Sequence, residues 1–186
     1  AADAGDKVTL AGLPTGLRYD AKTGKVTGVA TKAGTYTVRA TVKSGKSSYV
    51  STFTIEVAPL PSWAVGTFVG CGEGEIPGYD LAEDNLYGTV TVAANGKVSG
   101  RFLFDTGDER LLTSAFSAPA LTGHDAEGGC YFLDVTLAFR DGKTVVESRE
   151  CRLRIERNGG DAGIGGGMID VSGADVTLYQ NVWKVK

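Results

Sequence analysis

The 186-residue sequence predicts an all-β protein built from two domains. Apolar and polar residues alternate along most of the chain, as they do in half-buried strands, and no stretch shows a sustained helical period. The 27 glycines, about twice the usual share, lie among Val, Thr and aromatic residues and are typical of turns and bulges between strands. Two prolines, Pro59 and Pro61, interrupt the alternation and predict a domain boundary.

The N-terminal domain is placed at residues 1–58, the linker at 59–63 and the C-terminal domain at 64–186. In the N-terminal part, apolar residues recur at every second position along two runs, which are separated by a turn cluster at 44–47. The alternating residues are Tyr36, Val38, Ala40 and Val42 in the first run, and Phe53, Ile55 and Val57 in the second. Each run predicts a strand with one buried face.

A line of motifs crosses the same region. It runs Gly12-Leu13-Pro14-Thr15-Gly16-Leu17, then Asp20, Thr23-Gly24, Val26, Gly28, Ala33-Gly34-Thr35-Tyr36 and Val38. These residues resemble the putative Ig domain family of bacterial surface proteins, whose usual line is G-L-P-x-G-L, then D-x-x-T-G, then G-T-P-T-x-A-G-T-Y. The resemblance covers residues 7–57. It implies an immunoglobulin-like, cadherin-like β-sandwich and a secreted or cell-surface location, and it implies no particular activity.

The motif residues also have physical roles that can be read from the chain. Pro14 and Gly16 are expected to shape a tight corner that presents the flanking leucines to the core. Gly24 is expected to supply a positive φ at the end of a turn that begins at Asp20.

Family members normally carry further strands before the G-L-P segment, whereas here only residues 1–11 precede it. We therefore expect a sandwich that lacks its first strands and exposes an unpaired edge and apolar residues. Two explanations stay open: the chain is a piece of a longer repeat protein, or a strand of another chain completes the sheet at this N-terminal edge. The opening residues include no initiator Met and form no signal peptide, so a mature product or a fragment is expected.

The C-terminal domain repeats the β pattern on a larger scale. Strands are predicted near residues 65–70, 86–93, 97–105, 110–117, 130–140, 143–156, 163–171 and 175–185, with one helical turn near 80–86. Sequential strands with short connections favour an antiparallel up-and-down β-barrel or a curled sheet of about eight strands, with a two-sheet sandwich as the alternative. Residues 61–68 are also similar to a junction in large repeat-rich bacterial surface proteins, in which a β-domain follows the Ig module.

One hairpin of this domain can be given a register from the sequence. A two-residue turn at Asn95-Gly96 would place the valines of the first strand and the phenylalanines of the second on opposite faces. A three-residue loop, 94–96, with a left-handed Gly96 shifts the register by one and places all of them on one face. The predicted pairs are Val92 with Val98, Gly88 with Phe102, and Leu86 with Phe104.

Charge and hydropathy argue against nucleic acid and against a transmembrane helix. The net charge is −3, and the densest basic run, 149–157, is interrupted by Glu150 and Glu156, which fits a solvated strand better than a phosphate-binding track. No apolar run approaches the roughly 18 residues that a membrane-spanning helix needs. The expected partners are therefore proteins, including further copies of the chain.

The connection from Cys71 to Tyr87 gathers five carboxylates among glycines and two tyrosines. Hard cations bind several oxygen ligands on such loops, so calcium is a candidate, but the spacing matches no EF-hand. The candidate metal ligands are Glu73, Glu75, Asp80, Glu83 and Asp84. Alternatively, the connection is a binding loop over one end of the barrel, or an acidic loop that faces water. The candidate contact residues of a binding loop are Tyr79, Asp80 and Tyr87.

His124, the only histidine, precedes Asp125 in a glycine-rich connection. Such a pair could orient an imidazole for general-base catalysis, but a catalytic triad also needs a presented nucleophile, and the sequence has no G-x-S-x-G elbow. We therefore interpret His124 as a solvated loop residue. The run 159–167 lacks a following G-K-[ST] and is interpreted as a sharply bent strand end.

The three cysteines are too few for a disulfide framework and lack metal-ligand spacing. The hairpin at Asp141-Gly142 brings the strands of Cys130 and Cys151 together, so this pair is the expected disulfide. With a two-residue turn the two cysteines share a face but lie diagonally; with a bulged loop they face opposite ways and need a second bulge to bond. Cys71 is then free, or bonded to another chain.

Three functions follow from these patterns. The first is a non-enzymatic structural or adhesive module that acts through protein contacts. The second is a ligand-binding barrel for a sugar, a peptide or a small apolar molecule, which uses residues 71–87. The third is a glycan hydrolase that uses a carboxylate pair. A barrel interior filled by apolar side chains would favour the first function; the expected set is Phe102, Phe104, Val90, Val92, Leu133 and Val135.

Overall fold

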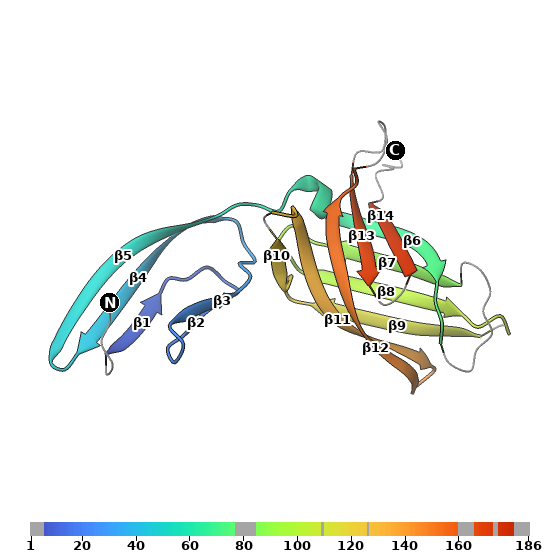
Figure 1. Ribbon diagram of the computed structural model, residues 1–186, viewed down its shortest axis with the longest axis horizontal. Helices are drawn as coiled ribbons and strands as arrows, with labels where there is room; N and C mark the ends of the chain where they lie inside the picture. Colours follow the sequence, from blue (N-terminus) through green and yellow to red (C-terminus); the bar gives the residue numbers. More distant parts are fainter. Residues whose placement is uncertain are drawn as a thin grey trace. The chain divides into compact units, whose positions relative to one another are not determined.

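The chain, described here from a computed structural model, divides into two compact units, Ala1–Pro59 and Leu60–Lys186. The division falls at the proline-rich segment. The structure describes residues 6–76, 85–108, 110–125, 127–159, 166–172 and 175–180, and all of its regular elements in both units are strands apart from one short 3-10 helix. Figure 1 gives the order of these elements along the chain.

The first unit consists of two small antiparallel sheets. A three-stranded sheet has the order β1-β4-β5, and β2 and β3 form a separate hairpin. The strands are β1 Lys7–Ala11, β2 Leu17–Asp20, β3 Lys25–Gly28, β4 Gly34–Ser44 and β5 Ser47–Val57. The two predicted strands of the 36–57 region are thus confirmed as β4 and β5.

Both predicted corners of the first unit are present. The backbone N–H of Leu17 donates to the Pro14 carbonyl at 3.0 Å, and a Cβ on Gly16 would lie only 2.0 Å from the Val29 carbonyl oxygen, so the corner excludes any side chain there. In the next turn, the Asp20 carboxylate accepts hydrogen bonds from the Lys22 N–H and the Thr23 hydroxyl, which lowers the pKa of Asp20. Gly24 closes that turn with φ of +69°, as predicted.

The edge of the sheet beside β4 is not unpaired, because strand β1 of the same chain occupies it. Strand β1 pairs antiparallel with β4, with Val8 opposite Val42 and Leu10 opposite Ala40. The opposite side of the sheet ends at β5, which pairs with β4 alone among the described strands. The long open edge of this unit is therefore that of β5.

The described strands of the second unit form a closed eight-stranded antiparallel barrel (Figure 1). Consecutive strands are neighbours, the last pairs with the first, and β9 closes the wall against β11 at Thr113 and Arg140. The barrel strands are β6 Gly66–Glu73, β7 Leu86–Val92, β8 Val98–Asp105, β9 Leu111–Ala118, β11 Cys130–Asp141, β12 Thr144–Arg157, β13 Gly167–Ser172 and β14 Asp175–Gln180. The up-and-down barrel is confirmed.

The predicted hairpin register is also confirmed. Val92 lies opposite Val98, and the loop is closed by a hydrogen bond of 2.8 Å from the Ala93 N–H to the Lys97 carbonyl. Gly96 adopts φ of +79°, as the three-residue loop requires. The remaining predicted pairs, Gly88 with Phe102 and Leu86 with Phe104, are present as well.

The interior of the barrel is filled by apolar side chains from alternate positions of its strands. Phe102 is fully buried and stacks on Phe116, with ring centroids 6.4 Å apart. The ring lies against Gly88, where a Cβ would come within 2.7 Å of it. Every member of the expected interior set is buried, with at most 9% of its surface exposed: Phe102, Phe104, Val90, Val92, Leu133 and Val135.

At each end of the barrel, a side-chain amide forms hydrogen bonds with backbone groups of the adjacent connections. At one end, buried Asn85 accepts from the Gly74 N–H at 2.8 Å and donates to the Gly74 carbonyl at 3.0 Å. At the other, Gln180 donates to the carbonyls of Ser62 and Val65 and accepts from the Gly167 N–H. The amides therefore fix the connections that lead into β7 and β6.

Two elements were not predicted. Residues Ser62–Ala64 form the 3-10 helix η1, and Gly123–Asp125 form a short strand, β10, which pairs with the start of β11. The described part of strand β13 begins at Gly167, and residues 163–165 of the predicted strand lie outside the described residues. A Cβ on Gly167 would lie 1.9 Å from the Trp63 carbonyl oxygen, so this position requires glycine. Most of the predicted helical turn at 80–86 lies outside the described residues, and Leu86 begins β7.

Candidate functional site

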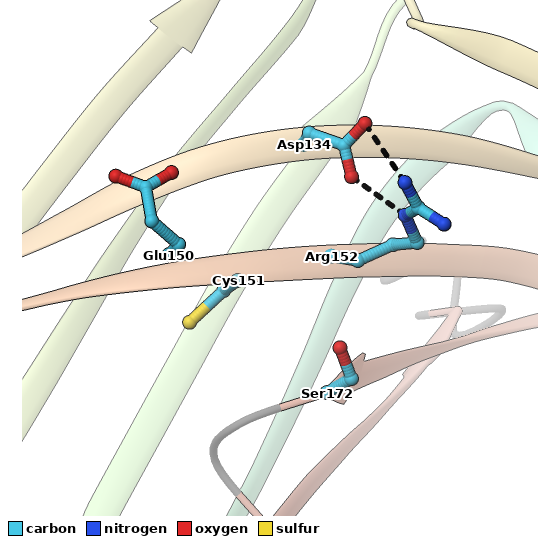
Figure 2. A pocket seen from close by; sticks show the side chains of 5 residues that line it. All are labelled: Asp134, Glu150, Cys151, Arg152 and Ser172. Carbon is cyan, nitrogen blue, oxygen red and sulfur yellow. Dashed lines mark hydrogen bonds and ion pairs between the residues drawn. The ribbon is translucent and has the colours of Figure 1, made fainter.

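The barrel surface carries a hollow of about 400 Å³ where β13 stops alongside β12. The last pair of these strands is Arg152 with Ser172, and β12 continues beyond it toward Thr144. The residues that line the hollow, shown in Figure 2, are Asp134, Glu150, Cys151, Arg152 and Ser172. Three of the five are titratable groups of β12, which makes the hollow the candidate site to examine for chemistry.

Arg152 and Asp134 form a two-pronged ion pair across β11 and β12. The arginine Nε donates to one carboxylate oxygen at 2.6 Å and its Nη2 to the other at 3.2 Å (Figure 2). The guanidinium also lies 5.5 Å from the centre of the Phe132 ring. Hydrogen bonds from Arg152 are the main reason that the pKa of Asp134 is lowered, so this carboxyl is ionised and unsuited to act as a general acid.

A second carboxylate of the hollow, that of Glu150, is also hydrogen-bonded. The Thr136 hydroxyl donates to a Glu150 carboxylate oxygen at 2.7 Å. Burial raises the pKa of the Cys151 thiol, which keeps the sulfur protonated and a poor nucleophile near neutral pH. The only histidine, His124, lies on β10 and does not line the hollow. The described residues of the hollow therefore provide paired surface charges and a protonated thiol.

The ion pair gives a pH-dependent prediction. A carboxyl whose pKa is lowered by folding adds stability above its unfolded pKa of about 3.9, and that contribution is lost as the pH falls through the lower, folded pKa. We expect the NMR titration of the Asp134 carboxyl carbon to have a midpoint below about 3.9. Arg152→Gln should raise the midpoint, whereas Arg154→Gln should leave it in place. An Asp134 midpoint unchanged by Arg152→Gln would contradict the assignment. Because both side chains are about half exposed, the effect on stability should be small.

His124 is exposed, in agreement with the interpretation as a solvated residue, although it lies on a strand and not in a loop. Its ring stacks on Tyr131 of β11 with centroids 4.5 Å apart, and Tyr131 in turn packs against Trp63. Asp125 accepts hydrogen bonds from the N–H groups of Glu127 and Gly128. These contacts of Asp125 therefore belong to a turn at the base of β11.

The residues proposed for the 71–87 region are only partly described. Tyr87 lies on β7 with 47% of its surface exposed, and Glu73 and Glu75 are exposed as well. Tyr79, Asp80, Glu83 and Asp84 lie outside the described residues. Within the ranges that the structure does describe, no three His, Cys, Asp or Glu side chains are grouped to hold a metal ion. The calcium site and the binding loop stay predictions.

The expected disulfide between Cys130 and Cys151 is wrong: all three cysteines are free. Cys151 lies opposite Val135, so Cys130 is five positions further along β11, about 16 Å away at the usual rise of a strand. A disulfide needs Cα atoms within about 7 Å of each other. A bulge next to Phe139 sets a register in which odd-numbered residues of β11 lie opposite odd-numbered residues of β12. The side chains of Cys130 and Cys151 therefore point to opposite faces of the sheet.

The burial of the thiols predicts their reactivity. Cys71 is exposed, whereas Cys130 and Cys151 have 1% and 4% of their surface exposed. We expect one thiol to react rapidly with an aromatic disulfide reagent in the native protein, and the other two to react only on unfolding. The Cys71→Ser variant should lose the rapid phase. A second rapidly reacting thiol in the native protein would contradict the barrel register.

An exposed apolar surface on β5 was not predicted as a site. Tyr49, Val50 and Phe53 have 65%, 50% and 44% of their surface exposed. The alternation of Phe53 with Ile55 and Val57 predicts a buried face for Phe53, but 44% of its surface is exposed. The signal that could have identified the surface is the near absence of charge from 47–57, where Glu56 is the only ionisable acid or base other than a tyrosine.

Among the described residues, no helix has the length and apolar composition that crossing a lipid bilayer requires. A comparison of the sequence with curated proteins found no match. The model of one protein family, described as Putative Ig domain, matches residues 1–58, which is nearly the whole of the first unit. With its paired strands β1, β4 and β5 and its two glycine corners, the N-terminal unit of this chain belongs to the putative Ig domain family.

Proposed function

We propose that the chain is a non-enzymatic structural or adhesive module that is secreted or held at the cell surface and acts through protein contacts. The putative Ig domain of residues 1–58 is typical of bacterial surface proteins. The observation that carries the proposal is the filled interior of the barrel. Phe68, Phe102 and Phe104 are fully buried there, so side chains occupy the space that a ligand-binding barrel keeps open.

The paired state of the surface hollow supports the same proposal. Its arginine is held by Asp134, its second carboxylate accepts from Thr136, and its thiol is protonated. A retaining or inverting hydrolase needs one carboxyl with a raised pKa and a second carboxylate free to act as a nucleophile or a base. The lowered pKa of Asp134 is the opposite of what the acid requires.

The proposal is tested by combining a ligand screen with a localisation measurement. Titration of the purified full chain with fluorescent apolar probes and soluble oligosaccharides should show neither saturable one-to-one binding nor glycan cleavage. Protease treatment of intact source cells, or analysis of the culture medium, should find the protein outside the cytoplasm. Glycan turnover that is lost in both Asp134→Asn and Glu150→Gln would overturn the proposal, and so would stoichiometric binding inside the barrel.

A further inference from the structure

Strand β5 forms a long, regular edge of its sheet, and no described strand covers it. Its pairing with β4 runs without a bulge from Gly34 with Val57 to Ser44 with Ser47, and no described strand pairs with its other side. Figure 1 shows it at the margin of its sheet. Alternate residues of an antiparallel strand direct their N–H and C=O groups to each side, so about half of the backbone groups of β5 face the open edge.

Natural proteins guard such edges with Lys, Pro, bulges or short strands. None of these devices is present between residues 47 and 57, which contain no Lys, Arg, Pro or Gly. The opposite edge of the same sheet, β1, has five residues and begins with Lys7. The barrel has no unpaired sheet edge of this kind, because its described strands close on themselves. The contrast makes the edge of β5 the candidate edge for pairing with another strand.

The exposed side chains of β5 lie on both of its faces. Tyr49 and Phe53 share the face on which Val38 of β4 is fully buried, since Phe53 lies opposite Val38 and Tyr49 lies opposite Val42. Val50 is half exposed on the other face. An added strand would cover all three residues while it satisfied the free backbone groups.

We propose that β5 pairs antiparallel with β5 of a second copy of the chain, about a two-fold axis through Ser51. The two three-stranded sheets then join into one continuous sheet. The inference rests on the proposed function and deepens it, because it names the partner as a second copy. The argument for this partner is that the strand is complementary to itself when it is reversed.

The reversed strand places matching residues opposite each other. Tyr49 lies opposite the partner's Phe53, and Lys46 in the β4–β5 turn lies opposite the partner's Glu56. Symmetry repeats each contact, which gives two aromatic pairs and two opposite-charge pairs per dimer. Cross-strand pairs of these two kinds are among those that stabilise antiparallel sheets. The remaining pairs are Val50 with Thr52, Ser48 with Thr54, and Ser47 with Ile55.

Neighbouring registers lose this complementarity. An axis through Thr52 places Tyr49 opposite Ile55, Phe53 opposite Ser51 and Lys46 opposite Ala58. An axis through Val50 places Tyr49 opposite Ser51 and Phe53 opposite Ser47. An axis between two residues would set inward side chains against outward ones, which an antiparallel pair does not permit. Ser51 is therefore the centre that matches both charge and aromatic residues.

Charge reversal tests both the dimer and its register. We expect the full chain to show a concentration-dependent monomer–dimer equilibrium by sedimentation velocity over about 1 µM to 1 mM. In a Lys46→Glu homodimer, two carboxylates would face each other at each of the two charge contacts, and in a Glu56→Lys homodimer two ammonium groups would do so. Each variant should weaken the dimer by about 10-fold at low salt. An equimolar mixture of the two variants should restore it, because the mixed dimer pairs one carboxylate-bearing strand with one lysine-bearing strand at both contacts.

A matched pair of lysine substitutions separates the edge from exposed apolar surface in general. Tyr49→Lys should abolish the dimer, whereas Leu111→Lys, at a residue of the barrel surface with 55% exposure, should leave it intact. Thermal melts and far-UV circular dichroism should show that both variants fold.

Several outcomes would overturn the inference. They are a wild-type chain that stays monomeric at 1 mM or about that concentration, a dimer that survives Tyr49→Lys, and a mixture of the two charge variants that stays monomeric. A larger assembly unaffected by Tyr49→Lys would also overturn it. None of these results contradicts the proposed function, which is overturned instead by glycan turnover or ligand binding inside the barrel.

Discussion

Replacing Phe102 with alanine is expected to lower the free energy of unfolding of the barrel by about 3 to 5 kcal/mol. The ring is fully buried and packs against Phe116 and the backbone of Gly88. Its removal therefore leaves a cavity inside the barrel, and the closed barrel wall has little freedom to collapse into it. Both tryptophans, Trp63 and Trp183, belong to the second unit, so denaturant titration followed by tryptophan fluorescence reports on the barrel.

Two variants serve as controls for this result. Leu111→Ala removes a largely exposed side chain of the same barrel and should change stability by less than about 0.5 kcal/mol. Gly88→Ala should cost about 1 to 3 kcal/mol, because its Cβ would meet the Phe102 ring and Leu178 at 2.7 Å. Its cost should be smaller in the Phe102→Ala background, where the ring is gone. Strict additivity of the two changes would contradict the observed packing.

Removing the Asn85 side chain should be nearly as damaging. The amide is 2% exposed and satisfies both the N–H and the carbonyl of Gly74, so Asn85→Ala leaves a buried donor and a buried acceptor without partners. We expect a loss of about 2 to 4 kcal/mol, measured by the same fluorescence titration. Asn95→Ala is the matched control, because Asn95 accepts a hydrogen bond from Lys97 in an exposed turn. Equal losses for the two variants would show that the Gly74 contact has no structural role.

The strands of the barrel could be predicted because its interior obeys a strict period of two. Along β7 and β8 the apolar residues and the glycines permit one register in which all rings face inward, and Gly96 fixes the loop that sets it. By contrast, Gly123–Asp125 offers only three residues with no alternation, and its pairing is determined by residues further along the chain. Such a strand has no local signal.

The disulfide prediction and the open edge of β5 failed for different reasons. Cys151 lies opposite Val135, five positions from Cys130. Without the bulge near Phe139 it would lie opposite Asp134, still four positions or about 13 Å away, so the separation along the strands excludes the bond in either register. The apolar residues of β5 have the pattern of a buried strand, and only the sheet order shows that nothing described covers Tyr49 and Phe53. Alternation predicts which residues share a face, and it does not predict whether that face has a neighbour.

The pairing of β14 with β6 has a mechanical consequence. These strands are the last and the first of the barrel, and they are antiparallel, so Gln180 lies opposite Phe68 and the chain enters and leaves the barrel at one end. A pulling force applied at these two points would peel the strands apart one hydrogen bond at a time and would not shear them together. The amide contacts from Gln180 to Ser62 and Val65 would bear the force first. Under tension between these two points, the barrel would therefore open from the β6–β14 seam.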